Sequence, residues 1–351
     1  MATKRDHGQF YTTRAAYILE GLPGPPEGVR CVLEPFAGQG DLLDWIHQRT
    51  PTLPVEAYDI DPKREDIRQR DTLRDPPDYT DTWVLTNPPY LARNKSTEKS
   101  LYDLYGTNDL YKCFLQSLCR TPCTGGIVIV PLGFLVGARD LDCRCRNEFL
   151  TQYRLLGVNY FEESVFADTS TTVVAIAFTR AETPLTEQEV RWTRYPSRET
   201  RIFPMRASEA WVIGGDLAQC PVPSTPTIRR HVEGQPLREG EQQTWMTLHA
   251  LDSGTPDGRI KLVYTKGYVY PAKESSRTYA TLRIVGRTMT EDDQEDLCRR
   301  FTTVLEQKRL DTWSLFLPQY RESKDYARKR IPFELAYRIL VWLLTTEPGA
   351  T

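Results

Sequence analysis

Four consecutive residues, Asn87-Pro88-Pro89-Tyr90, have the types and spacing needed to hold a planar amino group. They end an apolar run, residues 83–86, that predicts a buried strand. The side-chain oxygen of Asn87 and the carbonyl oxygen of Pro88 form a pair of hydrogen-bond acceptors, and two prolines of fixed φ keep that pair rigid. Tyr90 adds a flat face on which the ring that carries the amino group can stack. The motif therefore indicates alkylation of an exocyclic or amide nitrogen.

A glycine-containing segment, residues 33–41, follows the first predicted strand and opens a helix. Gly38 and Gly40 let the backbone turn tightly and approach a ligand closely, although a plain strand-to-helix turn has the same pattern. Asp59, at the end of the second predicted strand, can accept hydrogen bonds from ribose hydroxyls. Asp71 follows a less certain strand and can accept from an adenine amino group. Either acid can instead be a solvated loop residue.

The elements that must position these residues alternate between short β-rich runs and helices, which predicts an α/β fold. We expect a Rossmann-like, mostly parallel sheet with helices on both faces. Strands are predicted at 30–36, 55–59, 83–86, 126–131, 156–161 and 172–178, with helices at 40–48, 109–120 and 139–151. Asn108 is the expected N-cap of the second helix. The last two strands are separated only by a loop, which predicts a hairpin at the sheet edge.

The amino-acid composition changes after Arg180, where a polar stretch precedes a proline-rich segment, residues 220–236, that is typical of a linker. Strands are expected within 259–270, a helix after the N-cap Thr290, and a last helix at 332–344. We therefore divide the chain into residues 1–205 and a C-terminal, mixed α/β domain of residues 206–351.

Composition restricts the class of protein. The chain has 351 residues, of which 40% are hydrophobic and 26% charged, and no apolar stretch approaches the ~20 residues of a membrane span. An intracellular protein is expected, cytoplasmic if the host is bacterial. Eight scattered cysteines without a CxxC pair favour reduced structural thiols over a zinc site at Cys119/Cys123 or Cys143/Cys145, so no metal is expected. A net charge of −2 argues against coating nucleic acid by charge alone.

These motifs together resemble the S-adenosylmethionine-dependent DNA adenine-N6 methyltransferases of restriction-modification systems, in the subgroup whose cofactor motifs come first and whose target-recognition region comes last. Residues 8–12 resemble the segment that folds over the cofactor in relatives, and Val165-Phe166 with residues 171–176 resembles the motif whose aromatic ring packs against the extruded base. Residues 314–320 and 329–333 resemble restriction-type enzymes. The chain departs from the pattern at Phe36, where many relatives have a small residue, and at Thr13, where proline is commoner.

The resemblance implies transfer of a methyl group from S-adenosylmethionine to N6 of an adenine flipped out of double-stranded DNA. Residues 1–205 would be the catalytic, cofactor-binding domain and residues 206–351 the target-recognition domain. The implied catalytic residues are Asn87, Pro88, Pro89, Tyr90 and Phe166. The implied cofactor-binding residues are Phe10, Tyr11, Thr12, Glu34, Pro35, Phe36, Gly38, Gly40, Asp59, Ile60, Asp71 and Asn87.

The chemistry of the adenine amino group agrees with methyl transfer by these residues. The adenine amino group is a poor nucleophile until both its hydrogens are held by Asn87 and the Pro88 carbonyl. The sulfonium methyl is already activated, so alignment and exclusion of water are the main tasks, and no side-chain nucleophile is needed. Flipping the base costs a few kcal/mol, which stacking on Tyr90 and Phe166 would offset at about 1–3 kcal/mol each. The alternative for Phe166 is an ordinary core side chain.

Basic residues alternate with tyrosines in the C-terminal part, which is compatible with a DNA-contacting face or with solvated strands. The DNA-binding candidates are Lys266, Lys273, Arg277, Arg321, Lys329 and Arg330. Double-stranded DNA is the expected partner, with a cognate restriction endonuclease that forms no stable complex as a further one. No membrane partner is expected, and the chain would act as a monomer or a dimer.

Two other readings stay open. The same tetrapeptide serves enzymes that methylate RNA or a protein glutamine, although the long C-terminal region favours a reader of duplex DNA. A catalytically inactive DNA-binding relative is the second alternative, against which the intact motifs argue.

Overall fold

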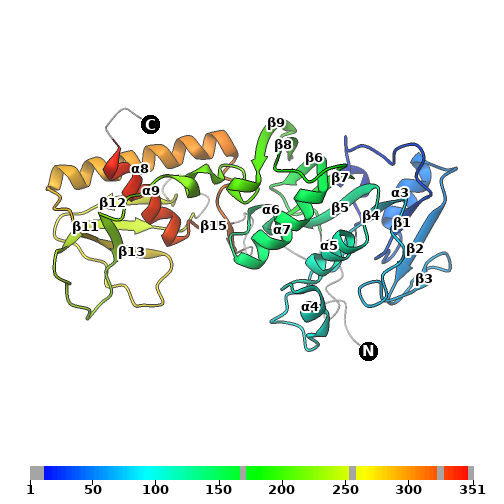
Figure 1. Ribbon diagram of the computed structural model, residues 1–351, viewed down its shortest axis with the longest axis horizontal. Coiled ribbons are helices and arrows are strands. Elements are labelled where there is room, and N and C mark those ends of the chain that lie inside the picture. The colour runs from blue at the N-terminus through cyan, green and yellow to red at the C-terminus, as the bar shows by residue number, and fades with distance from the viewer. Residues whose placement is uncertain (1–11, 167–170, 253–257, 322–327, 347–351) are drawn as a thin grey trace. The chain divides into compact units, whose positions relative to one another are not determined.

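The computed structural model describes residues 12–166, 171–252, 258–321 and 328–346. They separate into two compact units, with the division between Trp211 and Val212 (Figure 1). Unit 1 contains the large sheet and unit 2 a smaller one. Each is described by itself below.

Unit 1 is built on a nine-stranded sheet with the order β3-β2-β1-β4-β5-β7-β6-β8-β9. Its strands are β1 (Cys31–Glu34), β2 (Val55–Asp59), β3 (Arg68–Gln69), β4 (Thr82–Thr86), β5 (Gly125–Pro131), β6 (Tyr153–Phe161), β7 (Val173–Arg180), β8 (Glu187–Tyr195) and β9 (Glu199–Arg206). Strands β3, β2, β1, β4 and β5 are parallel, and β7 runs antiparallel between β5 and β6. The chain order reverses between β1 and β4, which makes this the switch point where open α/β sheets bind ligands.

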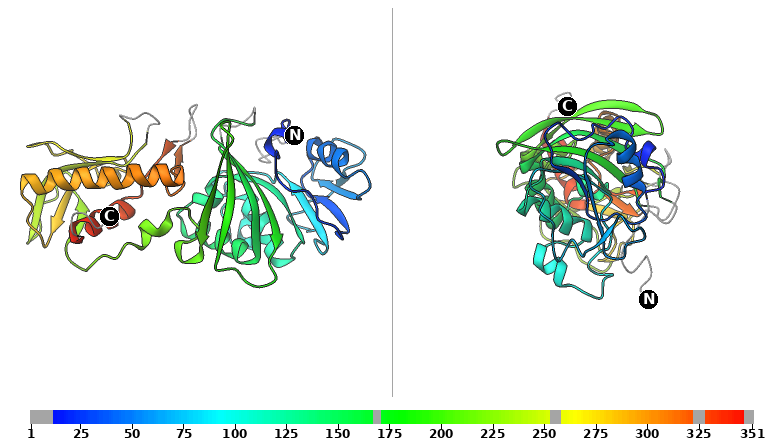
Figure 2. Two further views of the ribbon diagram at one scale, coloured as in Figure 1. Left: turned by 90° about the horizontal axis from the view of Figure 1, so that it is seen from above. Right: turned by 90° about the vertical axis from the view of Figure 1, so that its right-hand side faces the viewer.

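Helices cover both faces of this sheet, as its apolar strands require (Figure 2). The helices are α2 (Ala15–Ile18), α3 (Asp41–Arg49), α4 (Ser100–Tyr105), α5 (Leu110–Arg120), α6 (Gly133–Val136) and α7 (Asp140–Gln152). Side chains of alternate strand positions, such as Val32 and Leu85, share one core with α2 and α3. On the other face Phe178 of β7 meets Phe149 of α7, with ring centroids 5.2 Å apart. The predicted Rossmann-like α/β fold is confirmed.

All six predicted strands of this unit are present, but two details of the prediction are wrong. Strands β6 and β7 pair antiparallel, yet they are interior strands because β8 and β9 extend the sheet beyond β6. The polar appearance of β8 and β9 concealed them, since every second residue of β8 faces solvent. The N-cap of α5 is Asp109, whose side chain makes no capping hydrogen bond, in place of Asn108.

Unit 2 contains a four-stranded antiparallel sheet, β10-β13-β11-β12, packed against two helices. The elements are β10 (Thr227–Arg230), β11 (Glu241–His249), β12 (Lys261–Tyr264), β13 (Tyr279–Val285), α8 (Glu291–Thr312) and α9 (Phe333–Thr345), with a two-stranded ribbon of β14 (Gln319–Arg321) and β15 (Arg328–Lys329). Thr290 caps α8 as predicted, in a reciprocal capping box with Asp293 that is worth about 1 kcal/mol. The segment predicted to be a linker instead contributes β10.

No helix in the described ranges is both long and apolar enough to cross a membrane. Among the same residues no group of histidines, cysteines and acids is arranged to hold a metal ion. The eight cysteines are free thiols, and four of them, Cys31, Cys113, Cys123 and Cys145, are buried in unit 1.

Candidate active site

The predicted site residues that follow β1, β2 and β4 lie at one edge of the sheet of unit 1. Strands β1, β2 and β4 are parallel neighbours that end at Glu34, Asp59 and Thr86, so the loops that follow them emerge together. Asn87 follows β4 directly and is 9% exposed. The sheet therefore brings the glycine loop and the Asn-Pro-Pro-Tyr turn to the two sides of the switch point.

The glycine loop is tied to the end of β2. Gly38 and Gly40 have φ values of 56° and 88°, a left-handed conformation that favours glycine. The amide of Gly38 donates to Oδ2 of Asp59 at 2.8 Å, and the amide of Asp61 donates to Oδ1 at 2.9 Å. Two backbone bonds thus orient the buried carboxylate of Asp59 at the start of the loop that leads into α3.

Glu34 is the buried acid of the site. Its Oε1 accepts from the amide of Phe36 at 3.1 Å and from the hydroxyl of Thr86 at 2.5 Å. Its Oε2 is buried and has no hydrogen-bond partner within the described part of the chain. Burial raises the pKa of Glu34 to about 8, although the two hydrogen bonds act in the opposite direction. The carboxyl is therefore mostly protonated at neutral pH.

Asn87 is held from two sides. Its Nδ2 donates to Oγ1 of Thr12 at 3.2 Å, so Thr12 reaches the site, and the backbone of Thr12 also hydrogen-bonds Asp41 at the start of α3. Its Oδ1 lies 2.5 Å from the hydroxyl of Tyr90, which is 2.8 Å from the carbonyl oxygen of Ile129. Burial raises the pKa of Tyr90 far above its ordinary value, so the hydroxyl stays protonated and can donate. These bonds fix the orientation of the Asn87 amide.

The other predicted cofactor residues line the same loops. Ile60, next to Asp59, is 43% exposed and offers an apolar face. The carbonyl of Pro35 accepts from the hydroxyl of Thr72 at 2.9 Å, which links the loops after β1 and β3. Asp71 accepts from the backbone amides of residues 73 and 74 and pairs with Arg74, so it stabilises its own turn. Phe36 packs edge-on against Phe114 of α5.

Of the aromatic candidates Phe10, Tyr11 and Phe166, the structure describes only Phe166. Phe10 and Tyr11 lie outside the described residues. Phe166 is only 4% exposed and belongs to the core that contains α2 and α3, as its alternative interpretation held. A phenylalanine in that position presents no free face to a base, and it has no place in the mechanism proposed below.

The six basic candidates of unit 2 fall into different environments. Lys329 is 9% exposed, and its ammonium donates to the carbonyls of Trp313 and Ser314 at 3.1 and 3.3 Å. The expectation that Lys329 contacts DNA is therefore wrong for this conformation, because the side chain closes the end of α8. Lys266 forms an exposed ion pair with Glu291, and Lys273 is exposed.

Arg277 and Arg330 line one cavity together with three arginines that the sequence analysis missed, Arg229, Arg230 and Arg238. Arg229 and Arg230 belong to β10, in the segment interpreted as a linker, and Arg238 lies in the loop that follows this strand. The β-branched residues Thr227 and Ile228 were the local signal for a strand. The side chain of Arg321 lies outside the described residues.

Comparisons with known proteins add little. No protein-family model matches the chain, and no curated protein matches its sequence. A chain from a type I restriction-modification system is 22% identical and covers 54% of this chain and 45% of its own, with a TM-score of 0.43. The methyltransferase subunit of the Streptococcus thermophilus type I system is 16% identical, with coverages of 57% and 57% and a TM-score of 0.42. The EcoKI M protein is 16% identical, with coverages of 47% and 44% and a TM-score of 0.36.

The chain thus matches about half the length of these solved structures. Identities and TM-scores this low do not decide the function of the chain. The function is therefore argued from the geometry of the site.

Proposed function

We propose that this chain is a site-specific DNA methyltransferase that transfers the methyl group of S-adenosylmethionine to N6 of an adenine flipped out of double-stranded DNA. The observation that carries this proposal is the position of Asn87 and Pro88. Two hydrogen-bond acceptors follow β4 directly at the switch point, opposite a glycine loop and the acid Asp59. That pairing of an amino-group holder with a nucleoside-binding loop suits transfer of a small group to nitrogen.

The residues present fit the cofactor. The unpartnered Oε2 of Glu34 is a buried polar atom at the end of β1, where a polar ligand group would satisfy it. Gly38 and Gly40 would cradle the ligand, Asp59 would hold ribose hydroxyls, and Ile60 would pack against the adenine ring, with Asp71 beyond it. Thr12, Pro35 and Phe36 complete the proposed lining. The cofactor supplies a methyl group that is already activated by its sulfonium.

The chain's own task is to hold the amino group. Asn87 Oδ1 and the Pro88 carbonyl accept its two hydrogens, which favours charge on the nitrogen as the new bond forms. A carbonyl oxygen has two lone pairs, so Oδ1 can accept from Tyr90 and from the base together. Pro89 keeps the turn rigid. Tyr90 both orients Asn87 through its hydroxyl and offers its ring to the base.

Unit 2 is the proposed target-recognition domain, and a restriction endonuclease of the same system is a proposed partner without a stable complex. The competing substrates are RNA and a protein glutamine, whose amide fits the same acceptors. Incubation with tritiated S-adenosylmethionine and duplex DNA, RNA or cell protein distinguishes them. Label in DNA adenine, absent from the Asn87→Ala variant, supports the proposal. Label in RNA or protein alone overturns it.

A further inference from the structure

Unit 2 contains a cavity of about 700 Å³ whose walls carry five arginines. Arg229 and Arg230 come from β10, Arg238 from the following loop, Arg277 from the loop before β13, and Arg330 from the segment before α9. The volume is that of a ligand site rather than a packing defect. The methyl-transfer site of unit 1 makes no use of this cavity.

The cavity has an excess of positive charge. Glu274 and Glu334 are the carboxylates of its lining, and the buried Glu241 pairs with Arg229 from behind. The lining has five guanidinium groups and two carboxylates, and the charge of Glu241 is shared between Arg229 and Arg283, so the wall is positive in a chain whose net charge is −2. Guanidinium groups bind phosphate in a bidentate manner, which makes phosphate the chemistry that this wall fits.

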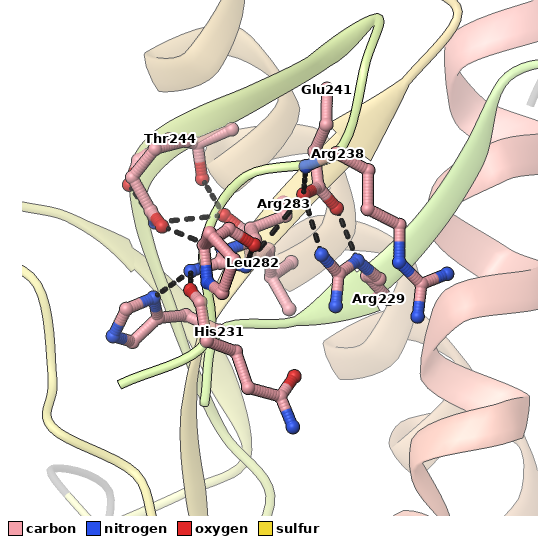
Figure 3. Close-up of polar contacts among 10 residues, drawn as sticks. Arg229, His231, Arg238, Glu241, Thr244, Leu282 and Arg283 are labelled. Carbon is pink, nitrogen blue, oxygen red and sulfur yellow. Dashed lines mark hydrogen bonds and ion pairs between the residues drawn. The ribbon is translucent and has the colours of Figure 1, made fainter. Parts of the chain in front are cut away.

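Arg229 and Arg230 are held in place by the fold, and Figure 3 shows the contacts of Arg229 with Glu241. The carboxylate of Glu241, whose side chain is fully buried, accepts from both Nε and Nη2 of Arg229. The guanidinium of Arg230 donates to the carbonyls of Ser276 and Glu274 and lies over the ring of Phe333, 5.6 Å from its centroid. These side chains are oriented before any ligand arrives, which lowers the entropic cost of binding.

The loop that carries Arg238 is held by the same network. Glu241 accepts from the amide of Arg238 at 2.9 Å. Arg283 is 2% exposed and donates to the carbonyls of Gln235 and Pro236 at 2.7 and 3.1 Å and lies 2.8 Å from Nδ1 of His231. Figure 3 shows the guanidinium of Arg238 extending away from this network. Arg283 therefore has a structural role.

Arg238 and Arg277 are the groups available to a ligand. Both side chains are exposed, and neither guanidinium makes a hydrogen bond or ion pair with the residues that the structure describes. The first turn of α9, at Pro332 and Phe333, also forms part of the wall and adds the positive end of a helix.

From this geometry we infer that the cavity binds backbone phosphate of the DNA substrate, with Arg238 and Arg277 as the contacting groups. The inference rests on the proposed function for its choice of nucleic acid. A free nucleotide fits less well, because it needs a surface for its base. The ring of Phe333 is already covered by Arg230 and packs 5.9 Å from the ring of Tyr337.

Fluorescence anisotropy with a labelled duplex, measured across a range of NaCl concentrations, tests the inference. The Arg238→Gln/Arg277→Gln variant should bind about tenfold or more weakly, and the slope of log K against log [salt] should fall by about two. The matched control is Arg259→Gln/Arg299→Gln, which removes two exposed, ion-paired arginines of the same unit. Equal slopes for the two variants, with unchanged melting temperatures, overturn the inference.

Calorimetry with inorganic phosphate and with AMP separates the two sources of phosphate. The Arg238→Gln/Arg277→Gln variant could lose a micromolar affinity for AMP and still bind DNA normally. That result would assign the cavity to a free nucleotide and reject contact with the DNA backbone. Methylation is scored separately with tritiated cofactor. A chain that binds DNA through the cavity but transfers no methyl group refutes the proposed function alone. Methylated DNA with an unchanged salt slope refutes the cavity alone.

Discussion

Replacing Glu34 by glutamine should remove a specific loss of stability that occurs as the pH rises from 4.5 to about 8. Burial raises the pKa of this carboxyl to about 8 from an ordinary 4.5. A carboxyl whose pKa is higher in the folded state binds its proton more tightly there, so protonation stabilises the fold. That contribution is complete below pH 4.5 and is lost as the pH rises toward 8.

The size of the effect follows from the shift in pKa. Each unit corresponds to ~1.4 kcal/mol, so the free energy of unfolding should fall by roughly 3 kcal/mol between pH 5.5 and pH 7.5, because over this range Glu34 is ionised in the unfolded chain and still mostly protonated in the folded one. Glutamine imitates the protonated acid well. Its Oε1 can keep the bonds from the Phe36 amide and the Thr86 hydroxyl, and its amide nitrogen replaces the unpartnered Oε2.

Urea unfolding at several pH values, followed by tryptophan fluorescence, measures this difference. The variant should match the natural protein near pH 5 and exceed it in stability increasingly up to pH 8. Comparison between the two proteins cancels the titration of all other groups. Parallel pH dependence of the two proteins would refute the assignment of a raised pKa to Glu34.

Three further outcomes are expected. Asn87→Ala should abolish methyl transfer and leave cofactor binding by calorimetry largely intact; near-normal turnover would contradict the mechanism. Tyr90→Phe keeps the ring but removes the hydroxyl that orients Asn87, so methylation should slow about 2- to 10-fold. Tyr90→Ala should lose a further ~1–3 kcal/mol of stacking on the base. Equal methylation rates for the two variants would exclude stacking. Lys329→Met should lower the stability of unit 2 by about 1–3 kcal/mol in thermal melts and leave the salt dependence of DNA binding unchanged, and a reduced slope would return Lys329 to the DNA interface.

The interior of the large sheet was predictable because its strands are short apolar runs bounded by turn residues. The runs at 55–59 and 126–131 coincide with β2 and β5 to within one residue. The motif residues after β1, β2 and β4 could also be placed at one edge of the sheet, because the carboxyl ends of parallel strands meet at the same edge. Strands β8 and β9 escaped prediction because a polar, half-exposed strand has no apolar run to reveal it.

The residue types along the chain were sufficient to predict an α/β fold, the chemistry of Asn87 and Pro88, and the pairing of a glycine loop with Asp59. These features depend on the order of residues within short segments. Only tertiary contacts decided which groups are available. Lys329 and Arg283 look like surface cations in the sequence, but the fold buries them against carbonyl oxygens. Glu34 becomes a neutral acid because the sheet excludes water from it, and Arg229, Arg238 and Arg277 share one cavity because segments remote in the sequence meet there. Burial and the convergence of distant segments are properties of the folded chain, and no local pattern encodes them.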